Sequence, residues 1–327
     1  MDVLSDVLSA IRLTGAVFFD VERRAPWVAA TPQAESIAHL VMPDAEHVIM
    51  FHVVIEGRCW AEILHSGAKP QHLVAGDIIV LPMGDSHVLC SEPGMRVAPD
   101  FDRFFRPPDQ QLPFLIGSNG GTGEQTHFVC GYLGCDARPF NPLLRSLPRL
   151  MHVTAAASNA PVLQLFRMAT EETAMHRSGG ETVLAKLAEL LFVDALRRHI
   201  DGLPQDAIGW LSGLRDAQIG AALALLHGRP TENWTVVSLA REVGLSRSAF
   251  ADRFMFFMQD SPMHYLARWR MQLATHLLGR QGASVSRVAA EVGYESEAAF
   301  NRAFKKYVGV PPGSWRKTRS PATGHAS

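Results

Sequence analysis

Two stretches of this chain repeat each other: SLAREVGLSRSAFADRF at residues 238–254 and RVAAEVGYESEAAFNRAF at residues 287–304. Ala240, Glu242, Val243 and Gly244 recur 49 residues later as Ala289, Glu291, Val292 and Gly293. Phe250 and Phe254 recur 50 residues later as Phe300 and Phe304. A small residue lets two helices approach closely, and a glycine four residues later permits a tight turn. Two phenylalanines one helical turn apart then anchor the next helix by one face. The repeat predicts a helix-turn-helix that occurs twice.

The second helix of each copy has an opposite face without these anchors. In the first copy that face carries Arg247, Ser248, Ala251 and Asp252, and in the second it carries Glu297, Ala298, Asn301, Arg302 and Lys305. Ser246 and Ser296 stand just before these helices, where a hydroxyl can accept a backbone N–H and start the helix. An outward helix that follows a tight turn is the element that enters the major groove of DNA.

The charge of the chain is divided between its two parts. Residues 216–327 hold 14 Lys and Arg against 8 Asp and Glu, whereas residues 1–215 hold 17 against 24. Chance clustering of solvated charges would give the same division. Because the duplicated motif lies in the basic part, the division favours contact with a polyanion.

The duplicated motif resembles the AraC/XylS family of transcription regulators over residues 216–317. Its second-unit signature stands here as GYESEAAFNRAFKKYVGVPPGSWRK, and SPMHYLARWRMQLATHLL is similar to the family's linker helix. The resemblance implies that two recognition helices enter successive major grooves of double-stranded DNA. The base-reading residues would be Arg247, Ser248, Ala251, Asp252, Glu297, Ala298 and Asn301. Phosphate contacts, which position a protein without reading sequence, would come from Arg253, Arg268, Arg270, Arg302, Lys305 and Lys306.

Residues 15–135 consist of short apolar runs separated by Gly, Pro and Asp, such as VIMFHVVIEG and HLVAGDIIVLPMGDSHVL. This pattern predicts an antiparallel β-rich domain, either a sandwich or a barrel. The segment GDIIVLPMGDSH, which ends at His87, resembles the second cupin motif. The first cupin motif is eroded, because metal-binding cupins place paired histidines and a glutamate where this chain has Asp44, Glu46 and Met50, with His47 and His52 out of register. A complete iron or manganese centre is therefore not supported.

The resemblance over residues 1–155 is to the degenerate cupin sensor domains that precede AraC-type DNA-binding units. It implies a cupin-like antiparallel β-barrel that senses an effector. Prolines at positions 139, 142 and 148 mark the exit from the sheet. Two helices are expected after it, at residues 161–177 and 181–200. The second has an apolar stripe so broad that it needs a partner surface, either its own β-domain or a second subunit.

These observations predict an α+β chain with four parts. They are a sensor domain at residues 1–155, a helical linker that dimerises at 156–215, a DNA-binding domain at 216–317 and a flexible tail at 318–327. No apolar run approaches the roughly 18 residues of a membrane-spanning helix. Four cysteines without a recognisable leader lead us to expect a cytoplasmic protein.

The stretch HFVCGYLGC at residues 127–135 raises a question of chemistry. Cys130 and Cys135 are an odd number apart, so on a regular strand they point to opposite faces, and both reach one atom only if the chain turns at Gly131–Gly134. Three interpretations stay open: buried structural cysteines, a thiol sensor of oxidants or electrophiles, and a zinc site formed by Cys130, Cys135 and a histidine such as His87.

The function that these patterns favour is a transcription regulator and not an enzyme. It would bind double-stranded DNA as a homodimer, with RNA polymerase as a further partner, and an unidentified small molecule, metal or redox signal would act on its cupin-like domain. The alternative is a metal-dependent cupin enzyme fused to a DNA-binding domain, which has His87 but lacks the other ligands. DNA repair by alkyl transfer is excluded, because that chemistry needs four closely set cysteines.

Overall fold

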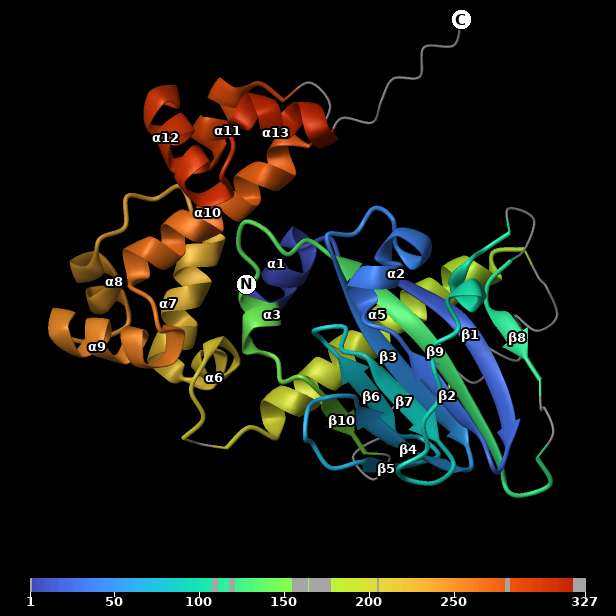
Figure 1. Ribbon diagram of the computed structural model, residues 1–327. Coiled ribbons are helices and arrows are strands. Elements are labelled where there is room, and N and C mark those ends of the chain that lie inside the picture. Colours follow the sequence, from blue (N-terminus) through green and yellow to red (C-terminus); the bar gives the residue numbers. More distant parts are fainter. Residues whose placement is uncertain are drawn as a thin grey trace, which may run out of the picture. The chain divides into compact units, whose positions relative to one another are not determined.

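The computed structural model describes residues 2–107, 111–117, 121–154, 164, 178–204, 206–279 and 283–319. The chain divides into two compact units (Figure 1). The first, called the sheet unit here, comprises Arg12–Asp136 and Leu147–Gly202. The second, the helical unit, comprises Met1–Ile11, Ala137–Ser146 and Leu203–Ser327. The compact units therefore do not follow the predicted boundary at residue 155, because two segments of the N-terminal half fold with the C-terminal helices.

The sheet unit contains a six-stranded sheet in the order β10-β6-β3-β9-β1-β8 and a four-stranded sheet in the order β2-β7-β4-β5. The strands of the first are β1 (Thr14–Arg24), β3 (His47–Glu56), β6 (Ile78–Leu81), β8 (Phe114–Ile116), β9 (Gln125–Cys135) and β10 (Met151–Val153). The strands of the second are β2 (Val28–Thr31), β4 (Arg58–Ile63), β5 (Gln71–Val74) and β7 (His87–Cys90). All pairings are antiparallel except that of β1 with β8. The predicted α+β class and β-rich N-terminal domain are confirmed.

The core of the sheet unit follows from the two-residue period of its strands. β3 is buried along almost all of its length, because it lies between β6 and β9 and α2 (Ala34–Val41) packs against it. A register shift between Val17 and Phe19 interrupts the pairing of β1 with β9. Beyond that shift the alternate residues Phe19, Val21 and Arg23 are all buried. The register of β1 therefore places the Arg23 side chain on the same face of the strand as the core side chains of Phe19 and Val21.

The helix α5 (Gly180–Asp201) packs against β1 of its own unit. A Cβ at Gly15 of β1 would lie 2.5 Å from the Ala185 carbonyl oxygen, so only glycine permits this approach. The helix predicted at 181–200 is confirmed, and its buried stripe is satisfied within the same chain. Val183 and Leu190 remain 51% and 44% exposed on the other side of the helix. The helix predicted at 161–177 lies almost wholly outside the described residues.

The helical unit is built from ten helices among the residues that the structure describes, together with their connecting turns. They are α1 (Val3–Ala10), α3 (Pro142–Ser146), α6 (Trp210–Arg215), α7 (Ala217–Gly228), α8 (Val236–Glu242), α9 (Arg247–Met258), α10 (Pro262–Leu278), α11 (Val285–Glu291), α12 (Glu297–Val308) and α13 (Pro312–Arg319). Among the described residues, the 3-10 helix η1 (Phe101–Phe104) belongs to the sheet unit. Within the described part of the chain, no helix combines the length and apolarity needed to cross a membrane.

Candidate functional site

The first helix-turn-helix consists of α8 and α9. A reciprocal capping box begins α8, in which the Thr235 hydroxyl accepts the Ser238 N–H at 3.0 Å and the Ser238 hydroxyl accepts the Thr235 N–H at 2.9 Å. Gly244 forms the turn with φ +72°, a left-handed conformation that favours glycine. Ser246 then caps α9 by accepting the Ala249 N–H at 3.2 Å. The predicted turn and cap are confirmed.

The second helix-turn-helix, formed by α11 and α12, repeats this construction. Gly293 has φ +80°, and a Cβ at this position would lie 2.7 Å from the Thr231 Cα. Glycine is therefore needed here both for the turn and for the close approach of the backbone before α8. Ser296 caps α12 by accepting the Ala299 N–H at 3.2 Å.

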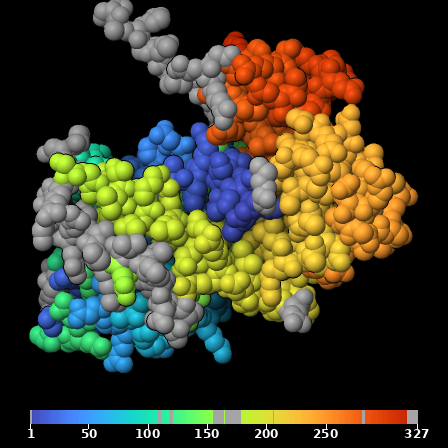
Figure 2. Space-filling view, turned by 180° about the vertical axis from the view of Figure 1, so that it is seen from behind, coloured from blue at the N-terminus to red at the C-terminus, as the bar shows by residue number. Residues whose placement is uncertain are grey.

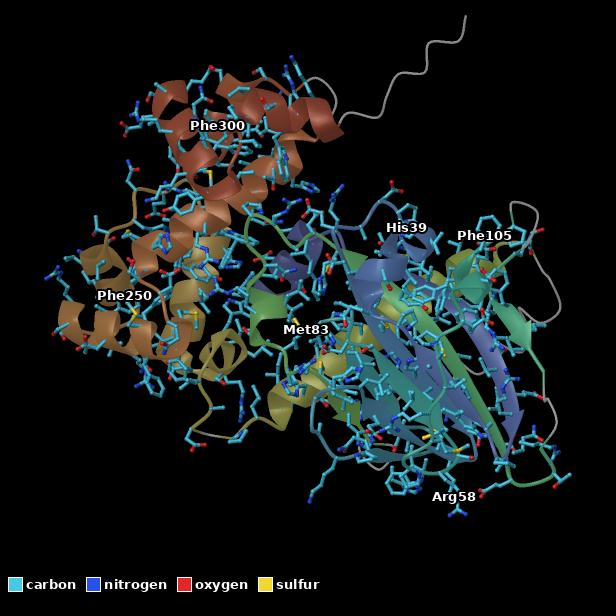
Figure 3. The ribbon with its side chains drawn as sticks, in the orientation of Figure 1. His39, Arg58, Met83, Phe105, Phe250 and Phe300 are labelled. Atoms are coloured by element: carbon cyan, nitrogen blue, oxygen red, sulfur yellow. The ribbon has the colours of Figure 1, made fainter. Side chains whose placement is uncertain are left out.

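The repeated small and aromatic residues form the interior of these motifs. The alanines are 2% exposed and the phenylalanines are fully buried: Ala240, Ala289, Phe250, Phe254, Phe300 and Phe304. Figure 3 shows Phe250 and Phe300 in two separate groups of helices. Since these side chains hold α9 and α12 by one face, the opposite face of each helix is left to solvent.

The predicted base-reading residues lie on these outward faces. Most are exposed, namely Arg247, Ser248 and Asp252 on α9 and Glu297 and Ala298 on α12. Ala251 and Asn301 are partly buried one turn further along their helices. The two faces carry different side chains at matching positions, so the two helices present different chemistry to a partner. Their contacts with bases stay a prediction.

The six predicted phosphate contacts differ in their surroundings. Arg302, Lys305 and Lys306 are exposed on α12. Arg253 instead pairs with Asp216, whose carboxylate also caps α7 by accepting the Ile219 N–H at 2.9 Å. This contact ties α9 to the start of α7.

Arg268 and Arg270 on α10 are committed to partners inside the helical unit. Arg268 lies 4.1 Å from the ring centroid of Phe140 and 3.2 Å from Asp260. Arg270 donates to the carbonyl oxygens of Pro230 at 2.6 Å and Glu232 at 3.0 Å. Burial lowers the pKa of both guanidinium groups. Both side chains are partly buried, and their contacts with phosphates stay a prediction.

The buried helix α10 also holds both N-terminal segments of the helical unit, which sequence reasoning missed. Gln272 is fully buried, and its Oε1 accepts the Phe140 N–H at 3.1 Å while its Nε2 donates to the Ala10 carbonyl oxygen at 3.1 Å. Phe140 also packs edge to face on Tyr265, with ring centroids 5.2 Å apart. One glutamine therefore joins α1 and the segment after β9 to α10, the helix between the two helix-turn-helix motifs.

In the sheet unit, two of the predicted sensor residues meet through a third. Cys130 on β9 pairs in register with His52 on β3, and its Sγ lies 2.8 Å from His52 Nδ1. His52 Nε2 lies 2.6 Å from Nε2 of His87, which begins β7 in the other sheet. His87 Nδ1 lies 2.8 Å from the Asp85 carbonyl oxygen. The structure thus brings His87 and Cys130 together through His52, which was expected to be out of register.

The directions of these hydrogen bonds determine which atoms of His87, His52 and Cys130 carry a hydrogen. A carbonyl oxygen only accepts, so His87 Nδ1 carries the hydrogen and His87 Nε2 accepts. His52 Nε2 must then donate, its Nδ1 accepts, and Cys130 donates as a neutral thiol. Burial agrees with this assignment, because it lowers the pKa of His87 to about 4, lowers that of His52 well below 6.5 and raises that of Cys130 well above 9.

The structure does not bring the sulfurs of Cys130 and Cys135 to one point. β9 is continuous through Gly131 and Gly134, so the two sulfurs point to opposite faces. Burial raises the pKa of Cys135 to about 12. Across the described ranges, no group of three His, Cys, Asp or Glu side chains is arranged to hold a metal ion. His127 instead faces Asp20, with Nε2 2.5 Å from Oδ1.

A cavity of about 280 Å³ lies in the sheet unit beside this chain of hydrogen bonds, and Cys130 belongs to its wall. Its walls also include Phe19, Phe104 and Phe128, and Arg23 lines it as a buried cation. No sequence motif indicated Arg23. Its only signal was a charged residue at an alternate position of an otherwise apolar strand.

Comparisons with known proteins find matches to both parts of the chain. Residues 2–201 match the family described as Cupin, and residues 239–318 match the family described as Helix-turn-helix domain. A putative AraC-like transcription regulator of Streptomyces lividans is 32% identical over 97% of this chain and 98% of its own length. The transcriptional regulator AlkR of Acinetobacter baylyi is 28% identical over 97% of this chain and 99% of its own. The solved DNA-binding domain of AdpA, in complex with a target DNA, is 27% identical over 32% of this chain and 92% of its own, with a TM-score of 0.30.

Proposed function

We propose a function from the premise that this chain belongs to the AraC-like transcription regulators and is a DNA-binding protein with a cupin domain ahead of its helix-turn-helix motifs. Our proposal is that both recognition helices bind one promoter sequence and that an effector held by the sheet unit changes this binding. The observation that carries it is the duplication of a serine-capped, phenylalanine-anchored helix with an exposed polar face.

The exposed cations of α12 supply the electrostatic part of this binding. Arg302, Lys305 and Lys306 have no carboxylate partner among the described residues. Each phosphate contact releases counterions, so affinity falls as salt rises, with a logarithmic slope of about −0.9 per contact. The cations raise the affinity for DNA of any sequence, whereas the residues on the outward faces select the site.

The test is binding to the DNA upstream of the protein's own gene, measured by fluorescence anisotropy across a salt series. Lys305→Ala with Lys306→Ala should reduce the slope by roughly two. Lys69→Ala, an exposed lysine between β4 and β5 of the sheet unit, serves as the matched control and should leave the slope unchanged. Binding that ignores salt, or no binding to any DNA, would refute the proposal.

We also propose that the protein acts as a homodimer through α5. The outward residues Val183 and Leu190 are both strongly exposed and lie two turns apart on one side of the helix. In Figure 2 the yellow-green helix α5 lies at the surface of the sheet unit. Val183→Glu with Leu190→Glu should yield monomers in analytical ultracentrifugation, and an unchanged dimer would refute this interface. RNA polymerase is the proposed downstream partner, tested by in vitro transcription from the same promoter.

We propose that the cupin domain does not act as a metal-dependent enzyme. The four imidazole nitrogens of His52 and His87 are all engaged in the hydrogen-bond chain from Cys130 to Asp85. A metal would have to displace these bonds to find a ligand. Elemental analysis of the purified protein should find iron, manganese, nickel and zinc well below one atom per chain, and a stoichiometric amount of any of them would contradict this proposal.

A further inference from the structure

We propose that the cavity of the sheet unit binds a small organic monocarboxylate with an apolar body, and that Arg23 holds its carboxylate. Such a molecule would be the effector of the sensing function proposed above, on which this inference rests. It names the chemical class of the ligand, which the cupin motif of this chain does not give.

The cavity lies between the two sheets, where β1 and β9 of one face the edge strand β2 of the other. β1 contributes Phe19, Val21 and Arg23, which share one face because they alternate along the strand. The whole of β2 lines the opposite wall. Phe104 of η1 also contributes and is 4% exposed, while Phe105 beside it points outward (Figure 3). The volume of about 280 Å³ corresponds to roughly nine water molecules, enough for a small ring or a short branched chain.

Arg23 is an unusual residue for such a wall. It is only 8% exposed, and its Nη1 donates to the Gly117 carbonyl oxygen at 2.6 Å and, more weakly, to that of Glu22 at 3.4 Å. The described residues offer no acceptor to its Nε and Nη2 and no carboxylate within ion-pair distance. A buried cation without a counter-ion is costly, because it has lost water and gained no opposite charge.

The other charges around the cavity do not neutralise Arg23. Arg103 is paired with Asp100 at 2.8 Å, and both side chains are about half exposed. Arg103 therefore brings its own counter-ion. Burial, together with the positive charge of Arg103, lowers the pKa of Arg23. The lining retains one net positive charge, which one carboxylate would balance.

The composition of the walls selects among anions. A guanidinium binds a planar carboxylate through two parallel N–H groups, and Nε with Nη2 is one such pair. Sugars and polyphosphates need many donors and acceptors, but most of the lining is Phe, Val, Ile and Ala. The remaining volume therefore suits an apolar body, whose burial adds the hydrophobic share of the affinity.

Cys130 connects such a ligand to the rest of the domain. Its thiol lines the cavity and donates to His52, which in turn donates to His87 in the opposite sheet. A ligand that displaces or compresses Cys130 would disturb the one polar chain that links the two sheets at this point. Ligand binding would thereby alter the hydrogen bonds from Cys130 through His52 to His87 without any covalent change.

The test uses three probes that share one skeleton: cyclohexylacetate, 2-cyclohexylethanol and 2-cyclohexylethylamine. Isothermal titration calorimetry on the full-length protein should show binding of the carboxylate that is at least tenfold tighter than that of the alcohol, and no binding of the amine. Arg23→Met should remove the preference for the carboxylate over the alcohol. Arg24→Met is the matched control, because Arg24 is the next residue on β1 and is exposed on the other face.

Two results would overturn the inference. One is equal binding of the carboxylate and the alcohol by the wild-type protein, or no carboxylate binding at all. The other is unchanged carboxylate affinity in Arg23→Met. Arg23→Lys keeps a cation in place, so if Arg23→Met fails to fold, Arg23→Lys should bind the carboxylate more weakly than wild type while still preferring it over the alcohol. An unchanged affinity in Arg23→Lys would then count against the guanidinium contact.

The sensing function is tested separately. DNA binding is measured with and without saturating cyclohexylacetate. Tight, Arg23-dependent binding of the carboxylate with unchanged DNA affinity would support the site and refute sensing by this ligand class. Regulation of DNA binding by an uncharged molecule that Arg23→Met still binds would support sensing and refute the site.

Discussion

Replacement of Gln272 by methionine should loosen the helical unit without changing its shape. Methionine keeps nearly the same volume, so packing alone should cost less than about 1.5 kcal/mol. It cannot replace the two hydrogen bonds that Gln272 makes with the Phe140 N–H and the Ala10 carbonyl oxygen, each 3.1 Å long. Both partners would stay buried without a bond, at about 1–3 kcal/mol each. We therefore expect Gln272→Met to lower the local free energy of unfolding by about 2–6 kcal/mol.

Hydrogen exchange followed by mass spectrometry measures this directly, because peptides from α1, residues 137–146 and α10 report their own opening free energies. All three should exchange faster in Gln272→Met, while peptides of the sheet unit keep their protection. Gln218→Met on α7 is the control and should change exchange by less than about 0.5 kcal/mol. A loss below about 0.5 kcal/mol in Gln272→Met would refute the idea that this glutamine fastens the two N-terminal segments.

Three further outcomes follow from the structure. Burial lowers the pKa of His52 and lowers that of His87 to about 4, so the unfolded chain binds more protons than the folded chain below pH 6.5. The sheet unit should therefore lose up to about 3 kcal/mol of stability from His87 as the pH falls from 6.5 to 4. Urea unfolding at each pH measures this loss, and a stability that does not change with pH would contradict the assignment of two neutral histidines. Cys130, held as a neutral thiol, should react with iodoacetamide at pH 7 far more slowly than free cysteine, and rapid labelling of the folded protein would contradict its assignment as a donor. Gly293→Ala should destabilise the helical unit more than Gly244→Ala. Both glycines have a positive φ, but only a Cβ at position 293 would meet another stretch of backbone. Equal losses of stability in thermal unfolding would show that this backbone contact does not matter.

The DNA-binding motifs could be predicted almost completely from the sequence. Helix-turn-helix geometry depends on residues close together in the chain: a small residue, a turn glycine, a capping serine and two phenylalanines one turn apart. The repetition of this pattern made chance an implausible explanation. The partners of Arg268 and Arg270 could not be predicted in this way, because Phe140, Asp260, Pro230 and Glu232 meet them only in the folded unit.

The sensor chemistry could not be obtained in the same way. His52 and Cys130 are cross-strand partners and His87 comes from the other sheet, so their meeting depends on strand register and on the packing of two sheets. Arg23 reaches the cavity because β1 shifts register after Val17. Single-residue shifts of this kind exchange the two faces of a strand, and local sequence does not specify where they occur.

The family, the α+β class and the duplicated helix-turn-helix could all be inferred from the sequence, because each depends on the spacing of residues close together in the chain. Which polar side chains have partners inside the fold, and which line a cavity, became visible only in three dimensions. The tertiary structure showed that Gln272 fastens two distant segments to α10, that Cys130 and Cys135 lie on opposite faces, and that Arg23 lies buried beside an apolar cavity. The physical reason is that hydrogen bonding, burial and charge pairing depend on neighbours in space, and those neighbours come from strands and helices far apart in the chain.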